Sequence, residues 1–519
     1  MPVDPCLGII AGGDENSEFW FPKTPQLNLG TRQALDDIRD KLDLCRRTHD
    51  TCRVTSAAQQ QEAVARPKRL LEIDTARGQC RVISAAGSDT EYAALSYCWG
   101  TSQSMLTSNN LANLRSGVHP DFFSQTLQDA IKVVLGCNLS HLWVDAICIV
   151  QDDPQELAEE IQNMGDIYSG ASFTIGAANS ATSKQGFLRG TPRVAYPITL
   201  SNHDKTETLL IMSPHPDIFG TDADHPLHSR GWALQESYFS REYVHFGPHS
   251  VAVSCATTTT DSCGIVWGFD PVSSYSHPSD RFTYHREASP KDWGKMITAY
   301  SSRELTVPSD KLVAISAVVK DMARKLRYPR PENYLAGLWR QNLASWLLWE
   351  IQVLPRPHPA RYRAPSWSWA SVDGKVQVVW ETSPELEIID AKTSWTGPFS
   401  AVTGGFVVVR GLMMAVSDYT MTEDGKFRLL GLFGRLDAAE PELLANSAQR
   451  PQLWLLRGHE KFIREDEIRA YGATEDYIRG FALVLLENAG GQSYRRIGSF
   501  SYSEHVWWGW SAKRTVRIE

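Results

Sequence analysis

The chain has 519 residues, more than one ordinary domain requires, so two or three hydrophobic cores are expected. Its 42% hydrophobic and 22% charged residues match average globular usage, which excludes a largely disordered chain. The net charge of −8 argues against broad binding to nucleic acid or anionic membranes, because such binding needs a basic face.

Tryptophan is unusually frequent, with 17 Trp beside 17 Tyr and 18 Phe. This surplus indicates either heavily packed cores or an aromatic-lined binding space, and composition does not separate the two. Nine irregularly spaced cysteines do not resemble a secreted disulfide framework. The N-terminus shows no basic leader, and no stretch reaches the ~18 apolar residues of a membrane span. We therefore expect a cytoplasmic protein without a membrane span.

The first half of the chain predicts a helix and then alternating strands and helices. Residues 1–68 form a predicted N-terminal helical segment, with apolar side chains at helical spacing over residues 31–55. Residues 69–260 form a predicted α/β domain in which short apolar strands alternate with amphipathic helices. Its expected elements are strands Tyr92–Tyr97, Leu142–Val150 and Ser172–Ala178, and helices over residues 125–136 and after Asp153-Pro154. This order predicts a parallel sheet with helices on both faces.

The second half predicts a helical layer followed by a strand-rich region. A short helix over residues 228–240 and strands Tyr243–Phe246 and Val251–Cys255 close the α/β domain. Residues 261–360 form the predicted helical region, with helices at Trp293–Tyr300, Asp310–Arg327 and Tyr334–Glu350. Residues 361–519 form the predicted β-rich region, with strands at Gly405–Val416, Phe427–Phe433, Leu453–Leu456, Phe481–Leu486 and Val516–Ile518.

Three separated motifs stand out: Tyr92-Ala-Ala-Leu-Ser-Tyr-Cys-Trp-Gly100, Leu142-Trp-Val-Asp-Ala-Ile-Cys-Ile-Val-Gln151 and Arg230-Gly-Trp-Ala-Leu-Gln-Glu236. In this order and at these separations they resemble the fungal heterokaryon-incompatibility (HET) domain. Downstream, Tyr334-Leu-Ala-Gly-Leu-Trp339, Pro365-Ser-Trp-Ser-Trp-Ala-Ser371 and Tyr494-Arg-Arg-Ile-Gly498 are similar to the segments that usually follow it. Nearly the whole chain is therefore similar to a stand-alone HET-type protein.

The resemblance implies a fold more firmly than an activity. HET proteins are associated with fungal non-self recognition and regulated cell death, so the resemblance implies an incompatibility partner protein or a small-molecule ligand. Their core is thought to be TIR/flavodoxin-like, and some TIR proteins cleave NAD with a glutamate. Other HET-type chains look like enzymes of specialised metabolism, including cyclases. No cofactor is required on this interpretation, and NAD would be a substrate or ligand.

Ligands of parallel α/β sheets gather at the carboxyl ends of the strands, where two of the motifs end. We expect Glu236 and Asp145 to be the catalytic candidates, Glu236 stabilising positive charge on a ribose and Asp145 acting as acid, base or hydroxyl acceptor. The alternatives are a salt bridge of Glu236 with Arg230 or Arg241 and a structural hydrogen bond of Asp145. The expected substrate-binding residues are Ser96, Tyr97, Trp99, Gln151, Arg230, Trp232 and Gln235.

Other reactive residues favour structural roles. Cys98 and Cys148 have no adjacent base, and Cys148 is expected to be a small buried hydrophobe. Cys45, His49 and Cys52 share one helical face, but a structural zinc site needs a fourth ligand and none is evident, so no metal site is expected. The histidine-rich stretch from His215 to His249 is expected in solvated loops.

The tryptophans of the downstream motifs allow two interpretations. Packed between layers, they would bury large areas; lining a cavity, they could fold a polyene for an intramolecular Diels–Alder-type cycloaddition that needs little acid–base chemistry. No G-x-S-x-G, Walker or G-x-G-x-x-G motif supports a serine hydrolase, a P-loop NTPase or a Rossmann enzyme. A biosynthetic cyclase and a non-catalytic interaction module therefore stay as alternatives to the incompatibility effector.

Overall fold

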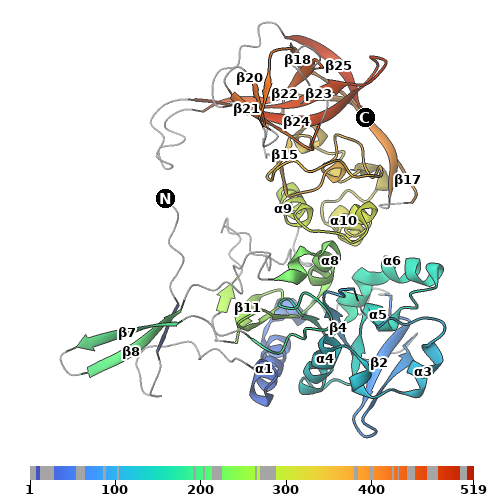
Figure 1. The fold of residues 1–519 in the computed structure, drawn as a ribbon, viewed down its shortest axis with the longest axis vertical. Helices are drawn as coiled ribbons and strands as arrows, with labels where there is room; N and C mark the ends of the chain where they lie inside the picture. The colour runs from blue at the N-terminus through green and yellow to red at the C-terminus, as the bar shows by residue number, and fades with distance from the viewer. Residues whose placement is uncertain are drawn as a thin grey trace. The chain divides into compact units, whose positions relative to one another are not determined.

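The computed structural model describes residues 8–11, 28–53, 65–85, 89–101, 104–190, 195–202, 205–212, 225–262, 266–268, 288–378, 384–397, 401–422, 426–429, 432–440, 443, 451–463, 477–502 and 511–519. The chain divides into two compact units, Met1–Arg286 and Glu287–Glu519. Each unit has its own sheets (Figure 1) and its own cluster of buried hydrophobic side chains.

The first unit is built on a nine-stranded mixed sheet with the order β12-β11-β10-β9-β6-β4-β5-β2-β3. Its strands are β2 (Arg69–Asp74), β3 (Gln79–Ser84), β4 (Ala93–Ser96), β5 (His141–Trp143), β6 (Phe173–Gly176), β9 (Tyr243–Phe246), β10 (Val251–Ser254), β11 (Thr258–Asp261) and β12 (Val266–Gly268). The helices are α1 (Arg32–Thr48), α3 (Leu111–Ser116), η1 (Pro120–Phe122), α4 (Gln125–Gly136), α5 (Asp145–Cys148), α6 (Pro154–Gly170), η2 (Pro226–Ser229) and α8 (Gly231–Phe239). A separate three-stranded sheet contains β1 (Gly8–Ala11), β7 (Ala195–Asn202) and β8 (Lys205–Met212).

The centre of the large sheet is parallel, as the sequence predicts. β4 pairs in parallel with β5 and β6, and β6 pairs in parallel with β9. The flanking strands are antiparallel, which makes the sheet mixed rather than wholly parallel. The chain moves from β4 to β5 in one direction and then from β5 past β4 to β6 in the other. Because such crossovers are right-handed, α4 and α6 must lie on opposite faces of the sheet.

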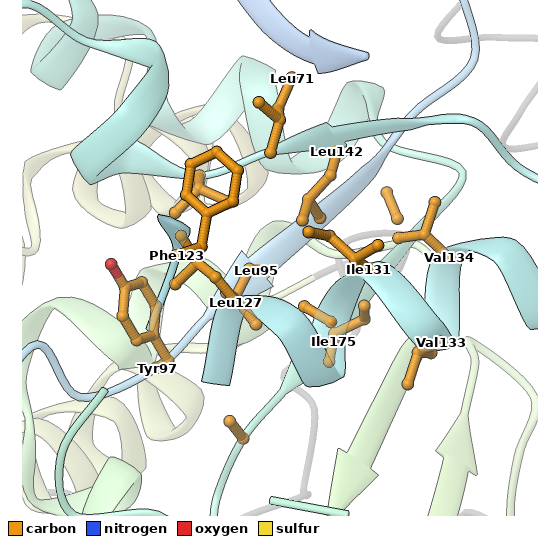
Figure 2. Close-up of a cluster of buried hydrophobic side chains, with 14 of the residues drawn as sticks. Leu71, Leu95, Tyr97, Phe123, Leu127, Ile131, Val133, Val134, Leu142 and Ile175 are labelled. Atoms are coloured by element: carbon orange, nitrogen blue, oxygen red, sulfur yellow. The ribbon is translucent and has the colours of Figure 1, made fainter. Parts of the chain in front are cut away.

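The side chains of the central strands confirm that both faces are covered. Ala93 and Leu95 of β4 belong to a hydrophobic cluster with Leu127 and Ile131 of α4 (Figure 2). Ser96, the residue after Leu95, instead contacts Glu236 of α8. Successive side chains of a strand point to opposite faces, so α4 covers one face and α8 the other.

The segment Leu142–Val150 is not the continuous strand that its apolar sequence predicts. β5 ends at Trp143, and Asp145 begins the one-turn helix α5. Asp145 favours this break because its carboxylate accepts the Ala146 N–H at 2.7 Å, and a short acidic side chain is well placed in a first helical turn. The correction moves Asp145 from the middle of a strand to just beyond the end of one.

The second unit contains short helices followed by a nine-stranded sheet. Its helices are α9 (Pro290–Ser301), η3 (Pro308–Lys311), α10 (Ser316–Lys325), η4 (Pro331–Asn333), α11 (Leu343–Trp346) and η5 (Trp369–Ser371). Its small strands are β13 (Tyr334–Leu335), β14 (Leu338–Trp339), β15 (Trp349–Ile351) and β16 (Val376–Val378). The large sheet contains β17 (Glu387–Trp395), β18 (Val402–Val416), β19 (Thr420–Met421), β20 (Lys426–Leu429), β21 (Leu432–Leu436), β22 (Leu453–Ile463), β23 (Tyr477–Glu487), β24 (Tyr494–Tyr502) and β25 (Ala512–Ile518). The β-rich C-terminal region is thus confirmed.

The predicted helix Tyr334–Glu350 is wrong. Its first half is a hairpin, in which Tyr334 pairs with Trp339 and Leu335 with Leu338. The two turn residues, Ala336 and Gly337, have φ values of 49° and 100°. Positive φ at both central positions defines the tight turn that matches strand twist, and a helix cannot continue through it.

The downstream tryptophans form a core. Trp293, Trp339, Trp346, Trp349, Trp367 and Trp369 are each at most 1% exposed. Trp293 and Trp369 both donate to the carbonyl of Gly337, at 3.0 and 2.9 Å, and the Trp293 ring packs edge-on against Trp339. The packing interpretation is therefore confirmed for these indoles. Trp395 is half-buried and stacks on Tyr334, whereas Trp380, Trp507, Trp508 and Trp510 lie outside the described residues.

Among the described residues, no helix combines the length and the apolar character that crossing a bilayer demands.

Candidate functional site

The candidate site lies at the carboxyl ends of β4 and β5. The helices that follow these adjacent strands, α4 and α6, cover opposite faces, so the connections diverge between β4 and β5. Such a switch point is where open α/β sheets bind ligands. Ser96 is the last residue of β4, and Asp145 follows the end of β5 by two residues. The topology brings the first two motifs together, as the sequence predicts.

Asp145 is held by an indole and by its own helical turn. The Nε1 of Trp99 lies 3.1 and 3.0 Å from the two carboxylate oxygens, and the Ala146 N–H lies 2.7 Å from Oδ1. Burial raises the pKa of Asp145 to about 7; the charge of Glu236 adds to this rise, and Arg230 opposes it. Asp145 is half-buried as a residue, and its pKa of about 7 means that its carboxyl group changes charge close to neutral pH.

Glu236 lies deeper than Asp145. It occupies the middle of α8, is 2% exposed and accepts a hydrogen bond from Ser96 Oγ through Oε2. The Ser240 hydroxyl, one turn later, lies 2.6 Å from the Glu236 carbonyl and 2.6 Å from the Thr174 hydroxyl. These contacts join α8 to β4 and β6 and leave little of Glu236 open to solvent.

Arg230 provides the positive charge for both carboxylates. It is the N-cap residue of α8, six residues before Glu236. Burial disfavours its charge, but the attraction of Glu236 and then of Asp145 raises the pKa of the guanidinium above its ordinary value. The charge of Arg230 is therefore stabilised by both carboxylates, and the salt bridge of Glu236 with Arg230 stays a prediction.

Two polar atoms of the motifs are buried beside this charge cluster. Neither Tyr97 Oη nor Gln235 Oε1 finds a hydrogen-bond partner among the described residues, although both residues are at most 1% exposed. Burial raises the pKa of Tyr97 well above its ordinary value, so its hydroxyl stays protonated. An unpaired buried polar atom costs about 1–3 kcal/mol, which a bound ligand or water would relieve.

The remaining predicted residues differ in whether they contact the charge cluster. Gln151 Nε2 donates to the carbonyls of Asp145 and Ile149, at 3.0 and 3.1 Å, so Gln151 holds the turn after β5. Trp99 and Trp232 are both half-buried. Trp99 contacts Asp145, whereas no hydrogen bond or ring contact joins Trp232 to the cluster within the described part of the chain.

The cysteines of the motifs do not add a nucleophile. Cys148 is 1% exposed, and burial raises the pKa of its thiol to about 12, which confirms the expected buried hydrophobe. Cys98 is 7% exposed, and burial likewise raises the pKa of its thiol. Neither sulfur is a thiolate at neutral pH, and the thiolate is the reactive form.

The histidines are not all in solvated loops, contrary to the prediction. His225 is 1% exposed, and its ring centroid lies 5.0 Å from that of His228 and 5.1 Å from that of His245. The fold brings residues of η2 and β9 together here, which spacing along the chain does not reveal. His215 lies outside the described residues.

The fold and site define an α/β protein with a doubly wound parallel centre and a carboxylate–guanidinium–carboxylate cluster at its strand ends. Residues 92–236 match the family model described as heterokaryon incompatibility protein (HET). This span of the chain is therefore similar to the HET domain. Comparisons with curated proteins and with solved structures returned no match. All nine predicted site residues lie inside the matched span, and Glu236 is its last residue.

Proposed function

We propose that this protein acts in fungal heterokaryon incompatibility, as a cytoplasmic effector of non-self recognition and regulated cell death, and that its site binds a nicotinamide nucleotide. The HET match supports the incompatibility role. The nucleotide proposal is carried by one observation: Ser96, Asp145 and Glu236, from three separate motifs, converge at the switch point of the sheet. No disulfide joins the seven described cysteines, which agrees with a reducing compartment.

Asp145 and Trp99 are the groups best placed to touch the nucleotide. Both are half-buried and they are hydrogen-bonded to each other, so an indole face and a carboxyl group are presented side by side. A carboxyl group with a pKa of about 7 can accept a ribose hydroxyl hydrogen bond or exchange a proton near neutral pH. Trp99 offers a flat surface on which a nicotinamide or adenine ring can stack.

The reaction that this arrangement suits is hydrolysis of the nicotinamide–ribose bond. The C–N bond breaks and its electron pair leaves with nicotinamide, while water adds to the ribose carbon and loses a proton to Asp145. Glu236 would stabilise the positive charge that develops on the ribose. Because Glu236 is 2% exposed, direct contact with the ribose requires that the side chains covering it move aside.

The test is incubation of the purified full-length protein with NAD, with nicotinamide release followed by chromatography and binding by calorimetry. We expect binding in the wild type and loss of turnover in Asp145→Asn and Glu236→Gln. Glu159→Gln is the matched control, because Glu159 is exposed and, within the described ranges, pairs with Gln155 and Lys68, away from the cluster.

The same variants expressed in a filamentous fungus separate the two halves of the proposal. Cell death that persists in Asp145→Asn and Glu236→Gln, with the variants folded, would leave the incompatibility role intact and reject the nucleotide chemistry. No NAD turnover, no NAD binding and no toxicity of the wild type would reject both.

The cyclase alternative is not put forward, because its expected aromatic cavity is not found among the described tryptophans. The six downstream indoles are packed against one another and their own backbone. The second unit does have an open depression of about 460 Å³, but charged side chains such as Lys392, Arg517 and Glu519 line it beside Phe406. A cycloaddition pocket would instead be closed and apolar.

A further inference from the structure

Four potential metal ligands converge at the end of α1, away from the carboxylate cluster. They are Cys45, His49, Cys52 and Cys255, and their ligand atoms all lie within 4.8 Å of one another. Sequence spacing reveals the first three, which come from one short segment. Cys255 is 203 residues beyond Cys52 and is brought in by the fold.

Local structure explains how the three N-terminal ligands converge. α1 ends at Thr48, and His49 is its C-cap with φ −92° and ψ 102°, so the predicted continuous helix is interrupted there. A helical turn resumes over residues 50–53. The break changes the chain direction at His49, and the ligand atoms of Cys45, His49 and Cys52 lie within 4.8 Å of one another.

The sheet places the fourth ligand independently. β10 ends at Ser254, and Cys255 opens the turn to β11. The Arg46–Glu242 ion pair, with Nη2 and Oε2 2.9 Å apart, holds α1 against the start of β9. Glu242 is buried and Arg46 is exposed, so the ion pair lies at the protein surface, where it helps keep Cys45 opposite Cys255.

The distances suit a tetrahedral zinc ion. With Zn–S of about 2.3 Å and Zn–N of about 2.0 Å, ligand atoms should be about 3.5–3.8 Å apart. Cys255 Sγ lies 3.3 Å from His49 Nδ1, and the whole set fits within 4.8 Å, so closure around an ion needs shifts of an ångström or less. Three sulfurs and one imidazole nitrogen form the Cys₃His donor set of structural zinc sites.

Backbone groups around Cys255 also suit a bound thiolate. The N–H groups of Thr257 and Thr258 both point at its sulfur from 3.4 Å. Donors of this kind lower the cost of negative charge on a ligating sulfur and orient it. The Thr257 hydroxyl lies 3.5 Å from Cys52 Sγ, so the same turn contacts two of the ligands.

We propose that Cys45, His49, Cys52 and Cys255 bind one Zn²⁺ ion that ties the N-terminal helix to the β10–β11 turn. The ion is structural, because all four coordination positions are filled by protein. The alternative is a disulfide between Cys255 and one of the other two cysteines. It would use two sulfurs only and leave His49 and the third thiol unexplained.

The test is the zinc content of the full-length protein, purified without chelator and desalted, measured by mass spectrometry of the metal. We expect about one zinc per chain. Removal with a strong chelator should lower the midpoint of thermal unfolding by several degrees, and added Zn²⁺ should restore it. Replacement by Co²⁺ should give the strong visible absorption of a tetrahedral thiolate site.

Variants assign the ligands. Cys255→Ser and Cys45→Ser should lose zinc, whereas Cys137→Ser, a half-buried cysteine outside the cluster, should keep it. If the ligand variants fail to fold, the wild-type cobalt spectrum decides. A wild type that takes up neither Zn²⁺ nor Co²⁺ under reducing conditions overturns the proposal, and so does a Cys255 disulfide in zinc-free protein. Neither result bears on the NAD experiments.

Discussion

Replacing Arg496 by Met should destabilise the second unit more than any surface change. Arg496 belongs to the Tyr494–Gly498 motif on β24 and is 2% exposed. Its Nε lies 2.7 Å from Asp437, which is 3% exposed, and its guanidinium also donates to the carbonyls of Leu347 and Trp349. The guanidinium carbon lies 3.4 Å from the Trp349 ring centroid.

The magnitude follows from what the substitution leaves behind. Removing one partner of a buried ion pair costs about 3–5 kcal/mol, and each orphaned carbonyl adds about 1–3 kcal/mol. Methionine recovers several kcal/mol because no guanidinium must then be desolvated. We therefore expect a net loss of about 4 kcal/mol at pH 7.

The loss should also depend on pH. Burial already raises the pKa of Asp437 above its ordinary value, although Arg496 opposes the rise. Without Arg496 the pKa rises further. A raised folded-state pKa gives stability that is present at low pH and lost as pH rises through that pKa. The penalty of Arg496→Met should therefore shrink as pH falls.

The assay is urea unfolding followed by tryptophan fluorescence, at pH 7 and pH 5. Arg514→Met is the matched control, because exposed Arg514 lies over Trp454 at 4.8 Å and its loss should cost less than about 1 kcal/mol. Equal effects of the two substitutions, or a penalty for Arg496→Met that does not change with pH, would refute the reasoning.

Two further predictions concern the first unit. Glu160 is 1% exposed and burial raises its pKa from 4.5 to about 7, so the wild type should lose stability between these pH values. Glu160→Gln should remove about 2 kcal/mol of that loss, allowing for solvent screening, and this should be seen as a flatter dependence of unfolding free energy on pH; an unchanged slope contradicts this. Tyr97→Phe removes a buried hydroxyl without a described partner, so thermal unfolding should show unchanged or slightly higher stability, whereas weaker NAD binding by calorimetry would reveal a ligand contact. A Tyr97→Phe loss above about 2 kcal/mol would mean that the hydroxyl is paired.

The spacing of apolar residues predicts an element correctly where the local sequence and the packing in the fold favour the same secondary structure. The helix after Asp153-Pro154 is confirmed as α6, because the Asp153 carboxylate caps the N–H groups of Gln155 and Glu156 and proline suits the first turn. Leu142–Val150 misleads because a buried strand and a buried helical turn are equally apolar, and only Asp145 marks the change. Tyr334–Glu350 misleads because the turn depends on positive φ at Ala336, which residue type does not announce.

The candidate site can be predicted only in part from the sequence. The motifs identify Ser96, Asp145 and Glu236, but their separation along the chain does not show that Arg230 interacts with both carboxylates. The role of Cys255 is even harder to predict from the sequence. A lone cysteine at the end of a strand carries no spacing signal, and it becomes a fourth ligand only through strand order.

The strand order has a consequence for how this domain can be exchanged between proteins. The matched span 92–236 contains β4, β5 and β6 but neither β2, which pairs with β5, nor β9, which pairs with β6. Cut at those limits, the three strands would expose unpaired backbone groups at both edges, which invites aggregation. A transplantable module must therefore begin before Arg69 and end beyond Ser254, and the cysteines of α1 and Cys255 mark its two ends.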